Sequence, residues 1–149
     1  MRHLTIPKIV IDSAHYIPGY KGKCANNHGH SWRIEDIILT VSDELDEQGI
    51  AIDFGDIKGY FKKEWDHKQY VPVQDKPIWI EHYKKLDMDI KQLKALRYTT
   101  CEDISDKIID DLFMMFDNIV QIGFTIYEGA SEGSGGEYKF KSRQEDFQE

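Results

Sequence analysis

Apolar and polar residues alternate over two stretches near the start of the chain, a pattern typical of half-buried β-strands. One face of residues 8–17 is formed by alternate positions that end at a histidine: Ile9, Ile11, Ser13 and His15. The second stretch, residues 28–42, also alternates, but its apolar parity changes at Glu35 and Asp36. Such a change predicts a β-bulge, with two short strands joined by a kink as the alternative.

Two later stretches have the three- and four-residue spacing of amphipathic helices. The first follows Asp56 and places its apolar residues on one side: Ile57, Tyr60, Phe61 and Trp65. The second begins at Thr99 and Thr100, where a capping box is available with Glu102 or with Asp103, respectively. Its apolar face is longer: Ile104, Ile108, Leu112, Met115, Phe116 and Ile119.

Two more strands complete the predicted fold. Residues 122–127 alternate, and a Gly- and Ser-rich turn at 129–136 leads to a shorter run around Tyr138 and Phe140. The predicted order is strand, strand, helix, helix, strand, strand. This order indicates an α+β domain with both helices on one face of an antiparallel sheet.

The remaining stretches carry weaker signals. Residues 70–98 are interrupted by Pro72 and Pro77, and we expect a long, partly ordered insertion or loop there. Residues 142–149 are expected to form a polar tail. Because the chain has 149 residues and shows neither a repeat nor a linker, we expect a single domain over residues 1–149.

The balance of charges narrows the choice of partners. Asp and Glu number 27 against 19 Lys and Arg, a formal net charge of −8, which argues against nucleic acid as a partner. No apolar run reaches the ~18 residues of a membrane-spanning helix, and the first residues lack the apolar core of a signal peptide. We therefore expect no membrane association and a cytoplasmic location, where Cys24 and Cys101 would be free thiols.

Three histidines form the strongest candidate site. His28 and His30 are two positions apart on a predicted strand, so they project from the same face. His15 ends the preceding strand, and antiparallel pairing can bring it opposite them. Converging imidazoles suit Zn²⁺, and three protein ligands leave a fourth position open, as in catalytic sites. The alternative is that these are surface histidines on an exposed strand.

Other polar residues have more than one interpretation from spacing alone. Cys24 is either a fourth metal ligand or a nucleophile or base beside the metal. Asp66 can orient His67 at the end of the first helix, or the helix dipole favours His67 there while Asp66 is solvated. Glu128 can pair with a guanidine-like edge such as that of a pterin, or it is a glutamate at the rim of the fold. Three basic residues near the histidines can hold an anion or remain solvated: Lys21, Lys23 and Arg33.

Taken together, these motifs resemble those of the 6-pyruvoyltetrahydropterin synthase and 6-carboxytetrahydropterin synthase family. They occur in the family's order: SAH at 13–15, CANNHGH at 24–30, DFGDIK at 53–58, DHK at 66–68, TCEDI at 100–104 and YEG at 127–129. The three-residue gap between Cys24 and His28 is similar to that of the bacterial 6-carboxytetrahydropterin synthases, which act in queuosine precursor synthesis.

The resemblance implies a role for each candidate residue. Three residues would bind a zinc cofactor: His15, His28 and His30. Cys24 would be a catalytic thiolate that transfers protons without binding zinc, and Asp66 and His67 would complete a relay with it. Three residues would lie at the pterin, the first as its anchor: Glu128, Thr100 and Glu102.

The resemblance also implies a fold and an assembly. The family has the tunnelling fold (T-fold), a four-stranded antiparallel sheet with two helices on one face in ββααββ order. Trimers of this unit close a barrel, and two trimers form a homohexamer with sites at subunit interfaces. The Asp-His pair reaches the site from a neighbouring subunit.

The implied activity is that of a zinc-dependent lyase. It would convert 7,8-dihydroneopterin triphosphate to 6-carboxy-5,6,7,8-tetrahydropterin, acetaldehyde and triphosphate. One alternative is a lyase that makes the 6-pyruvoyl product or cleaves a sepiapterin-type side chain, and another is a non-catalytic oligomer that binds zinc or a pterin. Three departures from the family pattern stand out: Tyr70–Val71 replaces the usual Leu-Asn, Gly129 replaces the usual Thr, and the segment between Asp66-His67 and Thr100 is longer than in the compact bacterial enzymes. The longer segment and Gly129 bear on the identity of the substrate.

Overall fold

The structure is a computed structural model that describes residues 1–144, within which the chain forms six strands and three α-helices. The strands are β1 (Arg2–His15), β2 (His28–Val41), β3 (Gln69–Pro72), β4 (Leu93–Leu96), β5 (Ile119–Tyr127) and β6 (Gly136–Ser142). The helices are α1 (Phe54–Glu64), α2 (Lys76–Lys85) and α3 (Cys101–Met115), and 3-10 turns lie at η1 (Lys23–Ala25), η2 (Val73–Asp75) and η3 (Ile90–Gln92). Of the predicted polar tail, residues 145–149 lie outside the described range.

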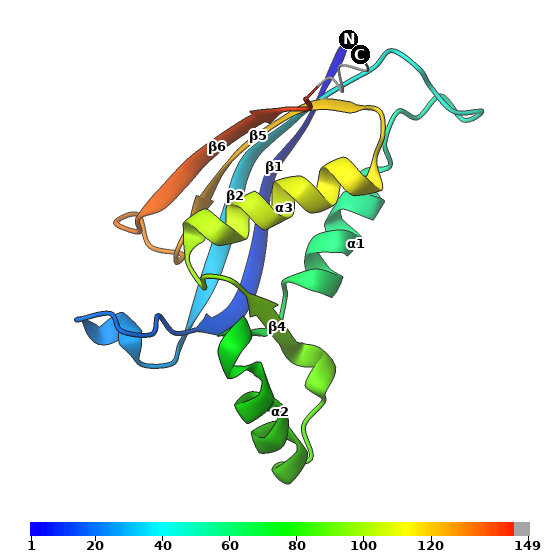
Figure 1. The fold of residues 1–149 in the computed structure, drawn as a ribbon. Helices are drawn as coiled ribbons and strands as arrows, with labels where there is room; N and C mark the ends of the chain where they lie inside the picture. Colours follow the sequence, from blue (N-terminus) through cyan, green and yellow to red (C-terminus); the bar gives the residue numbers. More distant parts are fainter. Residues whose placement is uncertain (145–149) are drawn as a thin grey trace, which may run out of the picture.

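The strands form one mixed sheet in the order β4-β3-β1-β2-β5-β6. The long strands β1, β2, β5 and β6 pair antiparallel, whereas β3 pairs parallel with both β1 and β4. Figure 1 shows α1 and α3 together on one face of the curled sheet. The α+β class is therefore confirmed. The expected four-stranded ββααββ arrangement is corrected to a six-stranded sheet with a third helix, α2.

The two predicted helices lie on the sheet because their apolar stripes complete its core. Ile57 and Phe61 of α1, and Ile108 and Leu112 of α3, are fully buried in one cluster with strand residues such as Trp32. Burying one large apolar side chain contributes about 1.5–3 kcal/mol, so this cluster dominates the stability of the fold. Among residues 1–144, no helix has both the length and the apolar character needed to cross a membrane.

The β-bulge lies where the apolar parity of β2 changes, as predicted. The pairing of β2 with β5 shifts register between Glu35 and Ile38, and Asp36 has a φ of 52°. Ile34 and Ile37 are both fully buried although they are an odd number of positions apart. The bulge therefore lets both halves of β2 turn their apolar side chains to the core.

Residues 70–98 are folded, which corrects the expectation of a long insertion or loop. The stretch contains most of β3, α2 and β4, held by a small second cluster of buried side chains from Val71, Tyr83 and Leu93. Pro77 stands in the first turn of α2, where its missing N–H is not required. The two strands escaped prediction because each has four residues and pairs only with strands distant in sequence.

Side-chain hydrogen bonds of Thr100 and Asp103 fix the start of α3. Thr100 is the N-cap, and its side-chain oxygen accepts a hydrogen bond from the Asp103 amide at 3.3 Å. The Asp103 carboxylate accepts one from the Tyr98 amide at 3.0 Å. Of the two predicted registers, the one with Thr100 as N-cap is therefore observed, but Asp103 accepts from Tyr98 and not from Thr100. These bonds hold the first turn of α3 with Cys101 and Glu102 in place.

Replacing Asp36 by Val is expected to lower the free energy of unfolding by about 1–2 kcal/mol, because a β-branched residue is disfavoured at positive φ. Urea denaturation followed by circular dichroism measures the change. Asp36→Gly is the matched control, since glycine adopts this conformation readily. Equal losses in the two variants would contradict the explanation.

Candidate metal centre and adjacent pocket

Antiparallel pairing of β1 with β2 brings three histidines together. His15, the last residue of β1, lies opposite His28, the first residue of β2, and His30 lies opposite Ser13. The centroids of the three rings are 4.6, 4.6 and 5.1 Å apart. His15 is fully buried, and the other two are partly buried. The three side chains therefore converge as their spacing predicted.

Hydrogen bonds from Nδ1 to backbone carbonyl oxygens orient two of these imidazoles. Nδ1 of His15 lies 2.6 Å from the carbonyl oxygen of Thr99, and Nδ1 of His28 lies 2.6 Å from that of Asn26. Because a carbonyl only accepts, each Nδ1 donates, and in the neutral ring this leaves the Nε2 lone pair free. All three Nε2 atoms are buried without a hydrogen-bond partner. Converging imidazole nitrogens of this kind fit a zinc ion.

Glu128 joins the histidines from a third long strand. It follows Tyr127, which ends β5 and pairs with Arg33 of β2. Its Oε1 lies 2.9 Å from Nε2 of His30 and 3.2 Å from Nε2 of His15. The four side chains offer ligand atoms that all lie within 4.8 Å of one another. Contact with His15, opposed by burial and supported by the other imidazoles, holds the pKa of Glu128 below its usual range.

A pocket of about 550 Å³ shares Glu128 with this cluster. Four predicted site residues line it: Cys24, Thr100, Glu102 and Glu128. Cys24 lies in η1, partly buried and free of any disulfide. It is not one of the residues whose ligand atoms converge. This placement favours a base or nucleophile beside the metal centre over a fourth metal ligand.

Cys101 is a pocket residue that spacing alone did not single out as functional. It is the first residue of α3, and its Sγ lies 3.9 Å from Oε2 of Glu128. Burial and the nearby carboxylates raise the pKa of Cys101 to about 12, so its thiol remains protonated and can donate. The carboxylate of Glu128 thus lies between the imidazoles near Oε1 and the thiol near Oε2.

Asp66 and His67 form a pair away from this pocket. His67 has a φ of 56°, and its Nδ1 lies 2.9 Å from Oδ2 of Asp66, whose Oδ1 accepts from the Asp12 amide at 2.9 Å. Burial opposes these contacts, but together they hold the pKa of Asp66 below its usual range. The His67 side chain is 77% exposed and lines a separate hollow with Lys68 and Lys91. The structure therefore brings the pair together but places it apart from Cys24.

Arg33 supports the turn after Glu128 and is not free to hold an anion. Its Nε donates to the carbonyl oxygen of Gly129 at 2.9 Å, and its Nη2 donates to that of Ser131 at 3.3 Å. The guanidinium also lies 4.4 Å from the centroid of the Tyr127 ring. This role was not evident from sequence because it depends on the pairing of β2 with β5.

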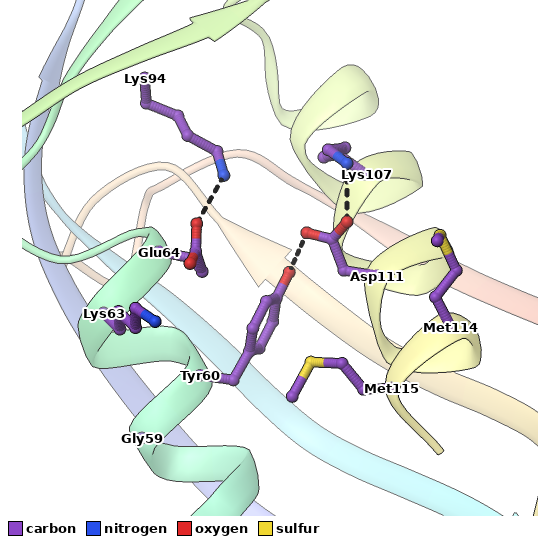
Figure 2. A pocket seen from close by; sticks show the side chains of 9 residues that line it. All are labelled: Gly59, Tyr60, Lys63, Glu64, Lys94, Lys107, Asp111, Met114 and Met115. Carbon is purple, nitrogen blue, oxygen red and sulfur yellow. Dashed lines mark hydrogen bonds and ion pairs between the residues drawn. The ribbon is translucent and has the colours of Figure 1, made fainter. Parts of the chain in front are cut away.

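A different hollow, of about 540 Å³, lies between α1, β4 and α3 (Figure 2). Most of its charged groups pair with one another. The Tyr60 hydroxyl donates to Asp111 at 2.7 Å, Lys107 reaches the same carboxylate at 2.7 Å, and Lys94 lies 3.3 Å from Glu64. Because these charges are compensated and no predicted site residue lines the hollow, we do not assign it to the candidate site.

Comparison with known proteins gives one family and several relatives. Residues 8–138 match the 6-pyruvoyl tetrahydropterin synthase family. A Rickettsia typhi protein named 6-carboxy-5,6,7,8-tetrahydropterin synthase is 38% identical over 82 residues, which are 51% of this chain and 58% of that protein. A protein of the same name from Rickettsia bellii is 29% identical over 110 residues, 71% of this chain and 77% of that protein. The chain thus spans less than two thirds of the first of these relatives.

One solved structure is similar in fold. The crystal structure of an uncharacterized protein from Wolinella succinogenes has a TM-score of 0.60 to this chain at 14% sequence identity. The similarity covers 93% of this chain and 99% of that protein. At this identity, the comparison supports the fold alone.

Removal of one imidazole tests the metal centre. The protein is expected to bind about one Zn²⁺ per chain. His28→Ala should weaken zinc binding by more than about 100-fold, a larger loss than is typical when a residue that only contacts a ligand is replaced. Competition with a chromogenic chelator measures the affinity. His82→Ala, which removes an exposed histidine of α2, is the matched control. Equal zinc affinity in the His28 variant and the wild type would refute the site.

Differential alkylation tests the states of the two thiols. At pH 8, iodoacetamide should modify Cys24 and spare Cys101, because a pKa of about 12 leaves roughly one thiol in ten thousand ionised. Peptide mass spectrometry locates the label, and unfolding in urea should expose both cysteines. Labelling of Cys101 in the folded protein as fast as Cys24 would contradict its buried, protonated state.

Proposed function

This chain belongs to the 6-pyruvoyl tetrahydropterin synthase family, and from that premise we propose that it is a zinc-dependent lyase acting on the side chain of a pterin. The reaction we assign is the conversion of 7,8-dihydroneopterin triphosphate to 6-carboxy-5,6,7,8-tetrahydropterin, acetaldehyde and triphosphate, in queuosine precursor synthesis. The names of the Rickettsia relatives support the carboxy product. One observation carries the proposal: three orphaned imidazole nitrogens converge beside the pocket that holds Cys24 and Glu128.

Three histidines would hold the zinc ion through Nε2: His15, His28 and His30. When bound, zinc supplies Lewis acidity to the substrate oxygens that it contacts. Cys24 would remove and return a proton on the substrate side chain, since it lines the pocket without joining the converging ligand atoms.

Glu128 would anchor the pterin ring. Its lowered pKa keeps the carboxylate ionised at neutral pH, the state that accepts two N–H groups of a guanidine-like edge. Because Oε1 now contacts His15 and His30, capture of the ring requires the carboxylate to turn toward the pocket. Thr100 and Glu102 line the same pocket from the first turn of α3, where they would border the ring.

Asp66 and His67 would complete the proton relay from a neighbouring subunit of a homohexamer built as a dimer of trimers. Two features support this assembly. His67 is exposed and lines a separate hollow with Asp66, and the edge strand β6 presents exposed Tyr138 and Phe140. The chain would then be a single T-fold domain with a short addition over β3, α2 and β4. We place it in the cytoplasm, where its two free cysteines remain reduced, with neither nucleic acid nor membrane as a partner.

Incubation of the zinc-loaded protein with 7,8-dihydroneopterin triphosphate, followed by mass spectrometry, tests the proposal. Carboxytetrahydropterin with acetaldehyde is the expected outcome. A 6-pyruvoyl product, or turnover only of a sepiapterin-type substrate, would replace the assigned reaction with another pterin lyase. Unchanged substrate in the presence of bound zinc would leave a non-catalytic protein that binds zinc or a pterin.

Replacing Cys24 by Ala should lower kcat at least about 100-fold, as expected for the loss of a general base. Zinc content and melting temperature should stay at the wild-type values, because Cys24 is not in the ligand set. Steady-state kinetics and metal analysis of the same preparation measure both. Loss of zinc together with activity would instead make Cys24 a metal ligand.

A further inference from the structure

A buried pair of hydrogen bonds joins the end of β1 to the segment before α3. His15 donates from Nδ1 to the carbonyl oxygen of Thr99 at 2.6 Å, and Thr99 donates from Oγ1 to the carbonyl oxygen of Tyr16 at 2.5 Å. His15 is 0% exposed and Thr99 is 1% exposed. The Thr99 hydroxyl therefore sets the position of the carbonyl that orients the His15 ring.

Tyr16 is itself anchored by the segment that follows β3. Its hydroxyl donates to Oδ2 of Asp75 at 2.6 Å and accepts from Nε1 of Trp79 at 2.9 Å. Asp75 belongs to η2 and Trp79 to α2, so both lie within residues 73–85, which we call the bracing segment. The Tyr16 hydroxyl is thus bonded to the bracing segment, and the Tyr16 carbonyl is bonded to Thr99. The Thr99 carbonyl in turn accepts from Nδ1 of His15.

We propose that Thr99 and Tyr16 are positioning residues for His15 and that the bracing segment holds them in place. The inference rests on the proposed metal centre but not on the assigned reaction. A carbonyl that accepts from Nδ1 selects the tautomer with a free Nε2, and such outer partners set both the ring orientation and the basicity of a metal-binding histidine. The bracing segment therefore tunes metal affinity without contacting the metal.

A purely structural role for these contacts makes a different prediction. Loss of a buried hydrogen bond would then lower the melting temperature and leave the metal affinity unchanged. Positioning requires that zinc affinity change and that a side chain with the same hydroxyl restore it. Thr99 allows this distinction, because Val keeps its shape and removes the donor, whereas Ser keeps the donor.

The first test compares Thr99→Val with Thr99→Ser. Chelator competition should show zinc binding about tenfold weaker in the Val variant and close to the wild-type value in the Ser variant. The visible spectrum of the Co²⁺-loaded Val variant should also change, because the geometry at His15 changes. A folded Val variant with wild-type zinc affinity and an unchanged Co²⁺ spectrum would overturn the proposal, even if its melting temperature were lower.

The second test is Tyr16→Phe, which can be used even if Thr99→Val does not fold. It removes the hydroxyl that bonds to Asp75 and Trp79, and zinc binding should again be weaker than in the wild type. Tyr98→Phe, at an exposed neighbouring tyrosine, is the matched control. Wild-type affinity in the Tyr16 variant would overturn the bracing role. A wild-type protein that binds no zinc would overturn the metal centre as well, whereas absence of lyase activity with zinc bound would affect only the assigned reaction.

Discussion

The antiparallel register of β1 and β2 is the constraint on which the candidate site depends. It runs from Arg2 opposite Val41 to His15 opposite His28. Because side chains alternate between faces, a slip of one residue would turn His28 to the other side of the sheet and separate it from His15. The same slip would expose the fully buried Trp32. The buried core therefore enforces the register that also brings the three histidines together.

This arrangement carries an energetic cost that a bound cation would relieve. Three Nε2 atoms are buried without hydrogen-bond partners, and each such atom costs about 1–3 kcal/mol. Oε1 of Glu128 lies close to two of these nitrogens and, as an acceptor, does not satisfy their lone pairs. A metal ion that binds only the folded chain would stabilise it through linkage. The metal-free fold is thus less stable at this point because its candidate metal ligands are buried without partners.

Sequence was most informative where local periodicity decides the outcome. Alternation alone indicates which strand face carries His15, His28 and His30, and it also indicates the bulge at Asp36. What was missed depends on contacts between distant segments. Glu128 reaches the histidines only because β5 pairs with β2, and the short strands β3 and β4 exist only through parallel pairing. The hydrogen bonds of the bracing segment likewise join residues about sixty positions apart.

The separation of Cys24 from Asp66 and His67 bears on how a proton relay would be completed. Acid–base partners must lie within hydrogen-bond reach, so either the turn at 66–68 moves or a second chain contributes the pair. Four hydrogen bonds tie that turn to β1, among them those from the His67 amide to the Asp12 carbonyl at 2.8 Å and from the Asp12 amide to Asp66 at 2.9 Å. Breaking all four would cost roughly 2–6 kcal/mol at the usual net value per bond. Association of two copies would leave these bonds intact, which is consistent with the proposed relay between subunits.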